Sequence, residues 1–139
     1  MLILDTDHMS QLHRGIPASA ELRDRLDASG LQFGTTIISV EELWRGRLAQ
    51  VAGNKNGKQL MVPYQRMNVL HEALSNWLVI PWTESAAGQY DHLRSLRLGI
   101  GSMDLRIAAI TIANSATLLS RNLKDFERVP ELKVEDWLS

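Results

Sequence analysis

The chain has 139 residues, a length typical of one domain, and we expect a single domain over residues 1–139. Hydrophobic residues make up 45% and charged residues 22%, which excludes a disordered or low-complexity protein. The absence of cysteine excludes disulfides and thiolate metal sites, and the net charge of -1 gives no sign of nucleic-acid binding. We expect a cytoplasmic protein that does not enter membranes, because the chain has no signal-peptide pattern and no apolar run near the roughly 18 residues of a span.

Short apolar strands and helices are expected to alternate from the start of the chain. Leu2–Leu4 is apolar and ends at polar residues, which predicts a strand followed by a helix that starts near Asp7. Pro17 indicates the start of a second helix, and Gly30 indicates its end. β-branched residues then predict a second strand over Phe33–Ile38.

The middle of the chain predicts two helices and a third strand. Ser39–Glu42 has the Ser-x-x-Glu form of a capping box, which predicts a helix from there to about Val51. Apolar residues keep a helical spacing from Leu60 to Leu78, where Pro63 marks either a kink or the true first turn. Leu78–Ile80 reads as the third strand.

The last third predicts two more helices and two more strands. A helix is expected from Thr83 to about Leu98, and Ser102 is expected to cap an apolar helix over Met103–Ala113. Thr117–Ser120 and Leu132–Val134 are the expected fourth and fifth strands. The alternation predicts an α/β fold with a mostly parallel sheet of four to five strands, covered by helices on both faces.

Acidic residues follow or adjoin several of these strands. Asp5 ends the first strand, Glu42 follows the second, Asp104 begins the helix that leads to the fourth, and Asp125 follows the fourth. Function in open α/β sheets gathers at the carboxyl ends of the strands. Four carboxylates aimed at one edge would repel one another unless a cation neutralised them, and Mg²⁺ prefers oxygen ligands. The chemistry that suits such a site is phosphodiester hydrolysis by an activated water.

Each acid also has a structural interpretation. Asp5 could cap the first helix, and Glu42 could serve the Ser39 capping box. Asp104 could complement a helix dipole, and Asp125 could be a turn residue. These interpretations stay open beside metal binding.

Four motifs resemble the PIN-domain ribonucleases, in the family's order. Leu4–Asp7 resembles their Leu-Asp-Thr-Asn opening, Glu42–Gly46 their Glu-Leu-x-x-Gly, and Asp104–Ala109 their Asp-x-x-Ile-Ala-Ala. Ser120–Val129 resembles the Thr-x-Asn-x-x-Asp-Phe segment of the VapC toxins, in the branch that cuts tRNA. The chain departs from the pattern at Asp7, where Asn is usual, and at Ser120, where Thr is commoner.

The resemblance implies a PIN-like three-layer α/β/α sandwich and an endoribonuclease that depends on Mg²⁺, with Mn²⁺ as a substitute. It implies the toxin of a type II toxin–antitoxin pair, with a VapB-like antitoxin as partner and tRNA or another structured RNA as substrate. Asp5, Glu42, Asp104 and Asp125 would be the catalytic acids, with Asp5 and Asp104 as direct metal ligands. A homodimer is expected because symmetric pairs are the commonest small oligomers.

Further residues are candidates for contact with substrate or partner. Arg45, Ser120 and Asn122 are candidate substrate-binding residues, although capping also explains Ser120 and Asn122. Glu41 lies four residues before Arg45, which predicts an ion pair on the helix surface. The helices that carry Leu48 and Met61 could instead form the antitoxin groove.

Two other functions remain open from the sequence. The chain could be a PIN-like module that binds RNA or antitoxin without cutting, since a fold does not guarantee turnover. Asp5-Thr6-Asp7 also fits the start of a haloacid-dehalogenase-like phosphatase, but Met9 stands where that pattern has Thr.

Overall fold

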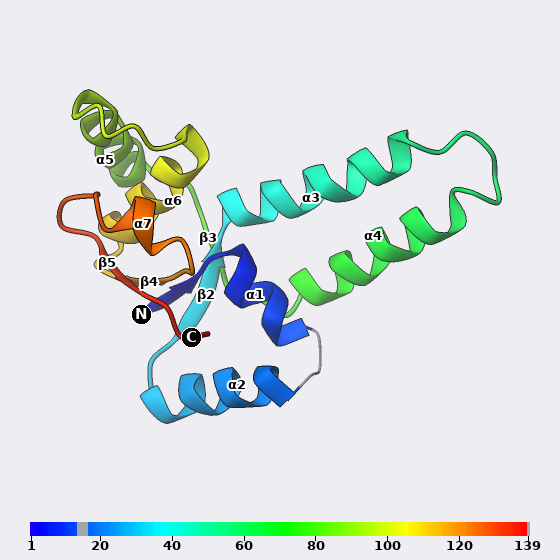
Figure 1. Cartoon of the computed structure of the whole chain (residues 1–139), viewed down its shortest axis with the longest axis horizontal. Coiled ribbons are helices and arrows are strands. Elements are labelled where there is room, and N and C mark those ends of the chain that lie inside the picture. Colours follow the sequence, from blue (N-terminus) through cyan, green and yellow to red (C-terminus); the bar gives the residue numbers. More distant parts are fainter. Residues whose placement is uncertain (14–16, 139) are drawn as a thin grey trace.

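The computed structural model describes residues 1–13 and 17–138. Five parallel strands form one sheet in the order β3-β2-β1-β4-β5 (Figure 1). The strands are β1 (Leu2–Leu4), β2 (Phe33–Thr36), β3 (Val79–Ile80), β4 (Thr117–Leu119) and β5 (Lys133–Glu135). The predicted parallel sheet is therefore confirmed.

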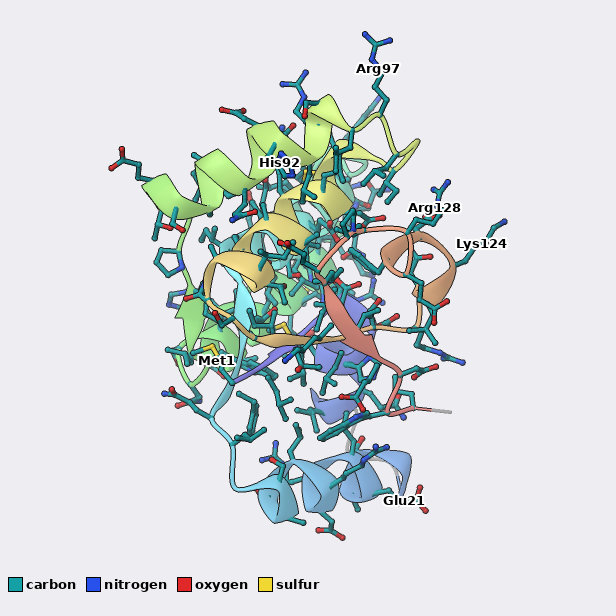
Figure 2. All side chains as sticks on the ribbon, turned by 90° about the vertical axis from the view of Figure 1, so that its left-hand side faces the viewer. Met1, Glu21, His92, Arg97, Lys124 and Arg128 are labelled. Atoms are coloured by element: carbon teal, nitrogen blue, oxygen red, sulfur yellow. The ribbon has the colours of Figure 1, made fainter. Side chains whose placement is uncertain are left out.

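Helices cover both faces of this sheet and make three layers. They are α1 (Thr6–His13), α2 (Pro17–Ser29), α3 (Ile37–Ala52), α4 (Met61–Leu74), α5 (Glu84–Ser95), α6 (Ser102–Ala113) and α7 (Leu123–Phe126). Strand β1 explains the layering, because Ile3 packs in the core under α5 and α6 while Leu2 and Leu4 pack in the core with α1 and α2. Figure 2 shows α5 and α6 above the strands and α2 below them.

The second strand is shorter than predicted. It ends at Thr36, and Ile37 and Ile38 belong to α3. The side chain of Thr36 caps α3 by accepting a hydrogen bond from the backbone N–H of Ser39 at 3.1 Å. The capping box predicted at Ser39–Glu42 is therefore wrong, since Ser39 lies inside the helix. Glu42 has no capping role to fill.

Three helix boundaries also differ from the prediction. Gly101 precedes α6 without a side-chain cap, so Ser102 is the first helical residue and not the cap. Helix α4 ends at Leu74, well before Leu78, and Pro63 lies in its first turn, where its missing N–H costs nothing. Helix α5 ends at Ser95 and is capped by the Thr83 hydroxyl, which accepts from the Ala86 N–H at 3.2 Å.

Helices α3 and α4 form an arm that extends away from the sheet (Figure 1). Apolar side chains remain exposed on this arm, among them Leu48, Met61 and Val62. No helix in the described part of the chain is long and apolar enough to cross a membrane.

Candidate active site

Two neighbouring strands bring the first site residues together. Asp5 directly follows β1 and Ser120 directly follows β4, and these strands pair in parallel. The Ser120 hydroxyl donates a hydrogen bond to Asp5 Oδ2 at 2.9 Å. Asp5 Oδ1 accepts a second bond from the Thr6 N–H at 2.8 Å. Two donors therefore hold the Asp5 carboxylate at the carboxyl edge of the sheet.

Helix α3 brings Glu42 to the same edge. The Thr6 hydroxyl donates to Glu42 Oε2 at 3.3 Å. Thr6 therefore links the two carboxylates, through its backbone N–H to Asp5 and through its hydroxyl to Glu42. No local pattern in the sequence indicates this role of Thr6, because the contact joins residues 36 positions apart.

Asn122 connects the remaining two acids. Its side-chain amide donates to Asp104 Oδ2 at 3.3 Å and to Asp125 Oδ2 at 3.2 Å. Its backbone N–H donates to the Ser120 hydroxyl at 3.1 Å. One network of hydrogen bonds thus runs from Asp5 through Ser120 and Asn122 to Asp104 and Asp125.

The acids raise one another's pKa. Burial is the largest cause of the raised pKa of Asp5, and the charges of Asp7 and Asp104 add to it. The pKa of Glu42 is raised by burial and then by the charge of Asp5. The pKa of Asp104 is raised by burial and by the charge of Asp125. Asp5, Glu42 and Asp104 therefore lie within electrostatic reach of one another, and the charge of Asp125 reaches Asp104.

Asp125 lies at the outer margin of this cluster. Its Oδ1 is 3.4 Å from a guanidinium nitrogen of Arg128, which also donates to the Gly99 carbonyl at 3.3 Å. Figure 2 shows Arg128 beside Lys124 on the outside of the molecule. Asp125 thus shares its charge between the cluster and a cation at the surface.

The donor set of this cluster consists of oxygen atoms, which is the kind that Mg²⁺ and Mn²⁺ accept. In the part of the chain that the structure describes, no three His, Asp or Glu side chains lie close enough together to hold a metal ion between them. Mg²⁺ often binds through one or two carboxylates and keeps several waters, so it does not need three protein ligands. Burial and mutual repulsion raise the pKa of Asp5 and of Asp104, and a bound cation would offset both effects.

Asp7, which stands where the family usually has Asn, lies in the first turn of α1 and contacts the neighbouring His8 and the segment that follows β4. Its Oδ1 lies 3.0 Å from Nδ1 of the buried His8, and its Oδ2 accepts from the Arg121 N–H at 3.3 Å. Burial acts to raise the pKa of Asp7, but the bonds from His8 and Arg121 outweigh it, and the pKa is lowered. The extra carboxylate therefore has its own donors, although its charge still adds to the raised pKa of Asp5.

Arg45 lies on α3, one turn beyond Glu41. Its guanidinium contacts Glu41 Oε2 at 2.6 Å, so the predicted surface ion pair is confirmed. The Arg45 side chain is largely exposed and that of Glu41 is partly exposed. Contact of Arg45 with a substrate stays a prediction.

No family model matches the chain. Ribonuclease VapC2 of Rickettsia felis is 36% identical over 77 residues, which are 52% of this chain and 58% of that protein. Ribonuclease VapC2 of Haemophilus influenzae is 25% identical over 122 residues, or 85% of each chain.

Solved structures extend the similarity to nearly the whole chain. The structure of VapBC2 from Rickettsia felis, bound to a DNA fragment of its promoter, matches with 27% identity and a TM-score of 0.69, covering 98% of both chains. This chain is similar to VapC ribonucleases in sequence and to VapBC structures in fold. VapBC-1 from nontypeable Haemophilus influenzae shares the fold, with a TM-score of 0.76 at 23% identity over 99% of this chain. The predicted VapC-type PIN fold is therefore confirmed.

Proposed function

We propose that this VapC relative is a metal-dependent endoribonuclease that acts as the toxin of a type II toxin–antitoxin pair. The observation that carries the proposal is the hydrogen-bonded network that joins Asp5, Asp104 and Asp125, with Glu42 tied to it through Thr6. These acids come from separate segments and meet at the carboxyl edge of a parallel sheet, where α/β enzymes bind their ligands. The names of its VapC relatives support a nuclease over a phosphatase.

Each acid has a role in this proposal. Asp5 and Asp104 would hold Mg²⁺, or Mn²⁺ in its place, because both carboxylates are partly buried and carry a raised pKa. The chemistry that the bound ion supplies is activation of water and screening of charge on the leaving oxygen. Glu42 would accept the proton of the attacking water, and its raised pKa brings it nearer to neutral pH. Asp125 would complete the cluster, and Ser120 and Asn122 would orient the carboxylates.

RNA is the proposed substrate, and tRNA is the class that the Ser120–Val129 resemblance favours. A VapB-like antitoxin is the proposed partner. The exposed apolar residues Leu48, Met61 and Val62 on the projecting arm suit an amphipathic partner segment. Four of the similar solved structures are described as VapBC complexes or systems, which supports a partner of this kind. The homodimer stays a prediction.

Cleavage of RNA by the purified, antitoxin-free protein tests the proposal. We expect discrete cuts in total bacterial RNA with Mg²⁺ or Mn²⁺, and none with chelator. Asp5→Asn and Asp104→Asn should each lower the rate by about 100-fold or more, as loss of a principal transition-state contact does. Asp24→Asn on α2 is the matched control, because this exposed acid lies outside the cluster and should cut like the parent.

Addition of a VapB-type antitoxin should stop the cleavage. Cutting that persists in chelator, or that survives both cluster substitutions, would refute the metal-dependent mechanism. RNA binding without cleavage by the parent under all metal conditions would favour the binding-module alternative.

A further inference from the structure

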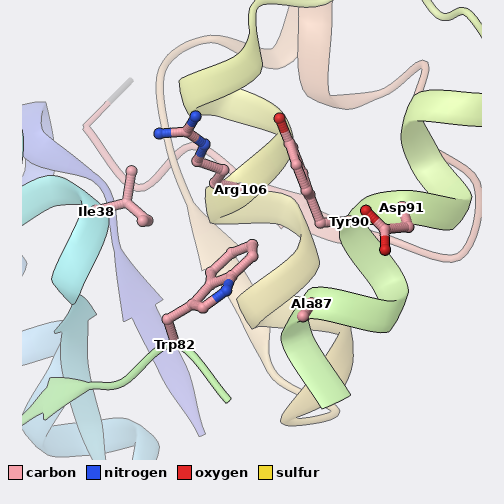
Figure 3. A pocket seen from close by; sticks show the side chains of 6 residues that line it. All are labelled: Ile38, Trp82, Ala87, Tyr90, Asp91 and Arg106. Atoms are coloured by element: carbon pink, nitrogen blue, oxygen red, sulfur yellow. The ribbon is translucent and has the colours of Figure 1, made fainter. Parts of the chain in front are cut away.

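A cavity of about 440 Å³ lies between α3, α5 and α6, beside the acid cluster. Its lining residues are Ile38, Trp82, Ala87, Tyr90, Asp91 and Arg106 (Figure 3). One of its walls leads toward the acid cluster, because Ile38 lies one helical turn before Glu42 on α3 and shares a helix face with it. A ligand in the cavity would therefore sit close to the proposed reaction centre.

Two aromatic side chains form one side of the cavity. Trp82 leaves 38% of its surface exposed, which is unusual for so large an apolar side chain. Its ring and that of Tyr90 meet edge to face, with centroids 5.6 Å apart and planes at 74°. Figure 3 shows the Trp82 indole reaching into the cavity toward Tyr90 and Arg106. Trp82 and Tyr90 thus present aromatic surface to a ligand in the cavity.

Two guanidinium groups flank the same aromatic pair. The guanidinium carbons of Arg94 and Arg106 lie 5.5 Å and 5.7 Å from the centre of the Tyr90 ring. No ion pair in the described part of the chain involves either arginine. Desolvation acts to raise the pKa of the Tyr90 phenol, but Arg106, Ser102 and Arg94 outweigh it and lower the pKa. Two positive charges therefore lie beside the Tyr90 ring, and the Asp91 carboxylate lines the same cavity.

We propose that this cavity receives an unpaired nucleobase of single-stranded RNA, stacked on the Trp82 ring with Tyr90 against its edge, and with a flanking phosphate on Arg106. The inference rests on the proposed function and names the part of the substrate that the chain recognises. Aromatic faces bind bases of any sequence, and arginine binds phosphate while also stacking on bases. A base inside a duplex could not enter, so the substrate must be single-stranded beside the cut. The carboxylate of Asp91, at the rim, suits the amino group of a base.

RNA binding by the chain that carries Asp104→Asn tests this inference without cleavage. Fluorescence anisotropy would follow labelled ten-nucleotide poly(A), poly(C) and poly(U) RNA in chelator at fixed salt. Trp82→Ala and Tyr90→Ala should each weaken binding by about 10-fold, the effect of losing one stacked base. Trp82→Phe should retain most of the affinity, and Arg106→Gln should weaken binding and reduce its salt dependence.

Tyr64→Ala is the matched control, because this tyrosine is 52% exposed on α4, outside the cavity. Its RNA affinity should equal that of the parent. RNAs that lack the base at one position each should show which base contacts Trp82. When that one base is absent, Trp82→Ala should no longer weaken binding, whereas it should still do so when any other base is absent. In the cleaving chain, Trp82→Ala should raise KM more than it lowers kcat.

Equal RNA affinity of the parent, Trp82→Ala and Tyr90→Ala proteins would overturn this inference, while cleavage by the parent would leave the proposed function intact. A fall in sedimentation mass on Trp82→Ala with unchanged RNA affinity would also overturn it, since the cavity would then join two copies of the chain. Failure of the parent to bind or cut any RNA would refute the proposed function and this inference together.

Discussion

Asp104 combines burial, a like-charged neighbour and one hydrogen-bond donor. Burial and the charge of Asp125 raise its pKa, and the Asn122 amide only partly compensates. A raised pKa means that the folded protein binds a proton more readily than the unfolded chain. The free energy of unfolding therefore falls as pH rises from the ordinary value of 3.8 through the raised value. Without a cation, this carboxylate destabilises the folded protein at neutral pH.

Asp104→Asn should stabilise the metal-free protein at pH 7 by about 0.5–2 kcal/mol, because the amide keeps an acceptor for Asn122 without the charge. Urea denaturation in chelator measures this, and the gain should shrink as pH falls through the raised pKa of Asp104. Mg²⁺ should stabilise the parent more than the variant. Asp24→Asn should show neither effect, and an equal gain in that control would refute the explanation.

At the scale of an element, the start of α3 decides where Glu42 lies. Thr36 is fully buried, ends β2 and pairs in register with Ile80 of β3. Its hydroxyl accepts from the Ser39 N–H and lies 3.4 Å from the Ser39 hydroxyl. The strand end and the helix start are therefore set by one side chain, six residues before Glu42.

Thr36→Ala should lower the free energy of unfolding by about 2 kcal/mol, at the upper end for a lost cap, because buried Ser39 would lose a partner as well. Thr83→Ala removes the cap of α5 at a more exposed position and should cost about 1 kcal/mol or less. Thr36→Ser keeps the hydroxyl and should recover most of the loss. Chemical denaturation measures all three, and equal costs for Thr36→Ala and Thr83→Ala would contradict this account.

At the scale of the whole molecule, the segment after β5 packs against α1 near the other end of the chain. Nε2 of the buried His8 accepts from the Trp137 N–H at 3.0 Å, and Nδ1 of the same ring lies 3.0 Å from Asp7 Oδ1. The Trp137 ring packs against the core with α1 and α2, and the Arg25 guanidinium lies 4.1 Å from its centre. The segment after β5 therefore covers the hydrophobic core between β1, α1 and α2, next to the strand that Asp5 follows.

Trp137→Ala should lower the free energy of unfolding by about 2–3 kcal/mol, less than a fully buried tryptophan would cost. The backbone bond to His8 remains in this variant, so the loss reports on packing of the ring. Trp82→Ala is the matched control, because its exposed ring should cost under about 1 kcal/mol. Urea denaturation measures the free energy of unfolding of both variants, and its dependence on urea concentration should be the same in both. Equal losses of stability in Trp137→Ala and Trp82→Ala would refute the prediction.

Local pattern predicted the order of strands and helices and the four acids of the candidate site. Short apolar runs, turn residues and caps act within a few positions, so Leu2–Leu4 and the stop at Gly30, whose φ is +66°, are readable from the sequence. The acids follow from the rule that parallel strands end at one edge. Asp5, Glu42, Asp104 and Asp125 could be named before any geometry was known.

Tertiary structure alone decided which of two good capping residues, Thr36 or Ser39, begins α3, because β2 must end where it pairs with β3. It also decided that Asn122 bridges two acids and that Asp7 turns to His8. The cavity around Trp82 joins segments far apart in the chain, and no local pattern marks it. Such contacts depend on how layers pack, which side-chain periodicity does not encode.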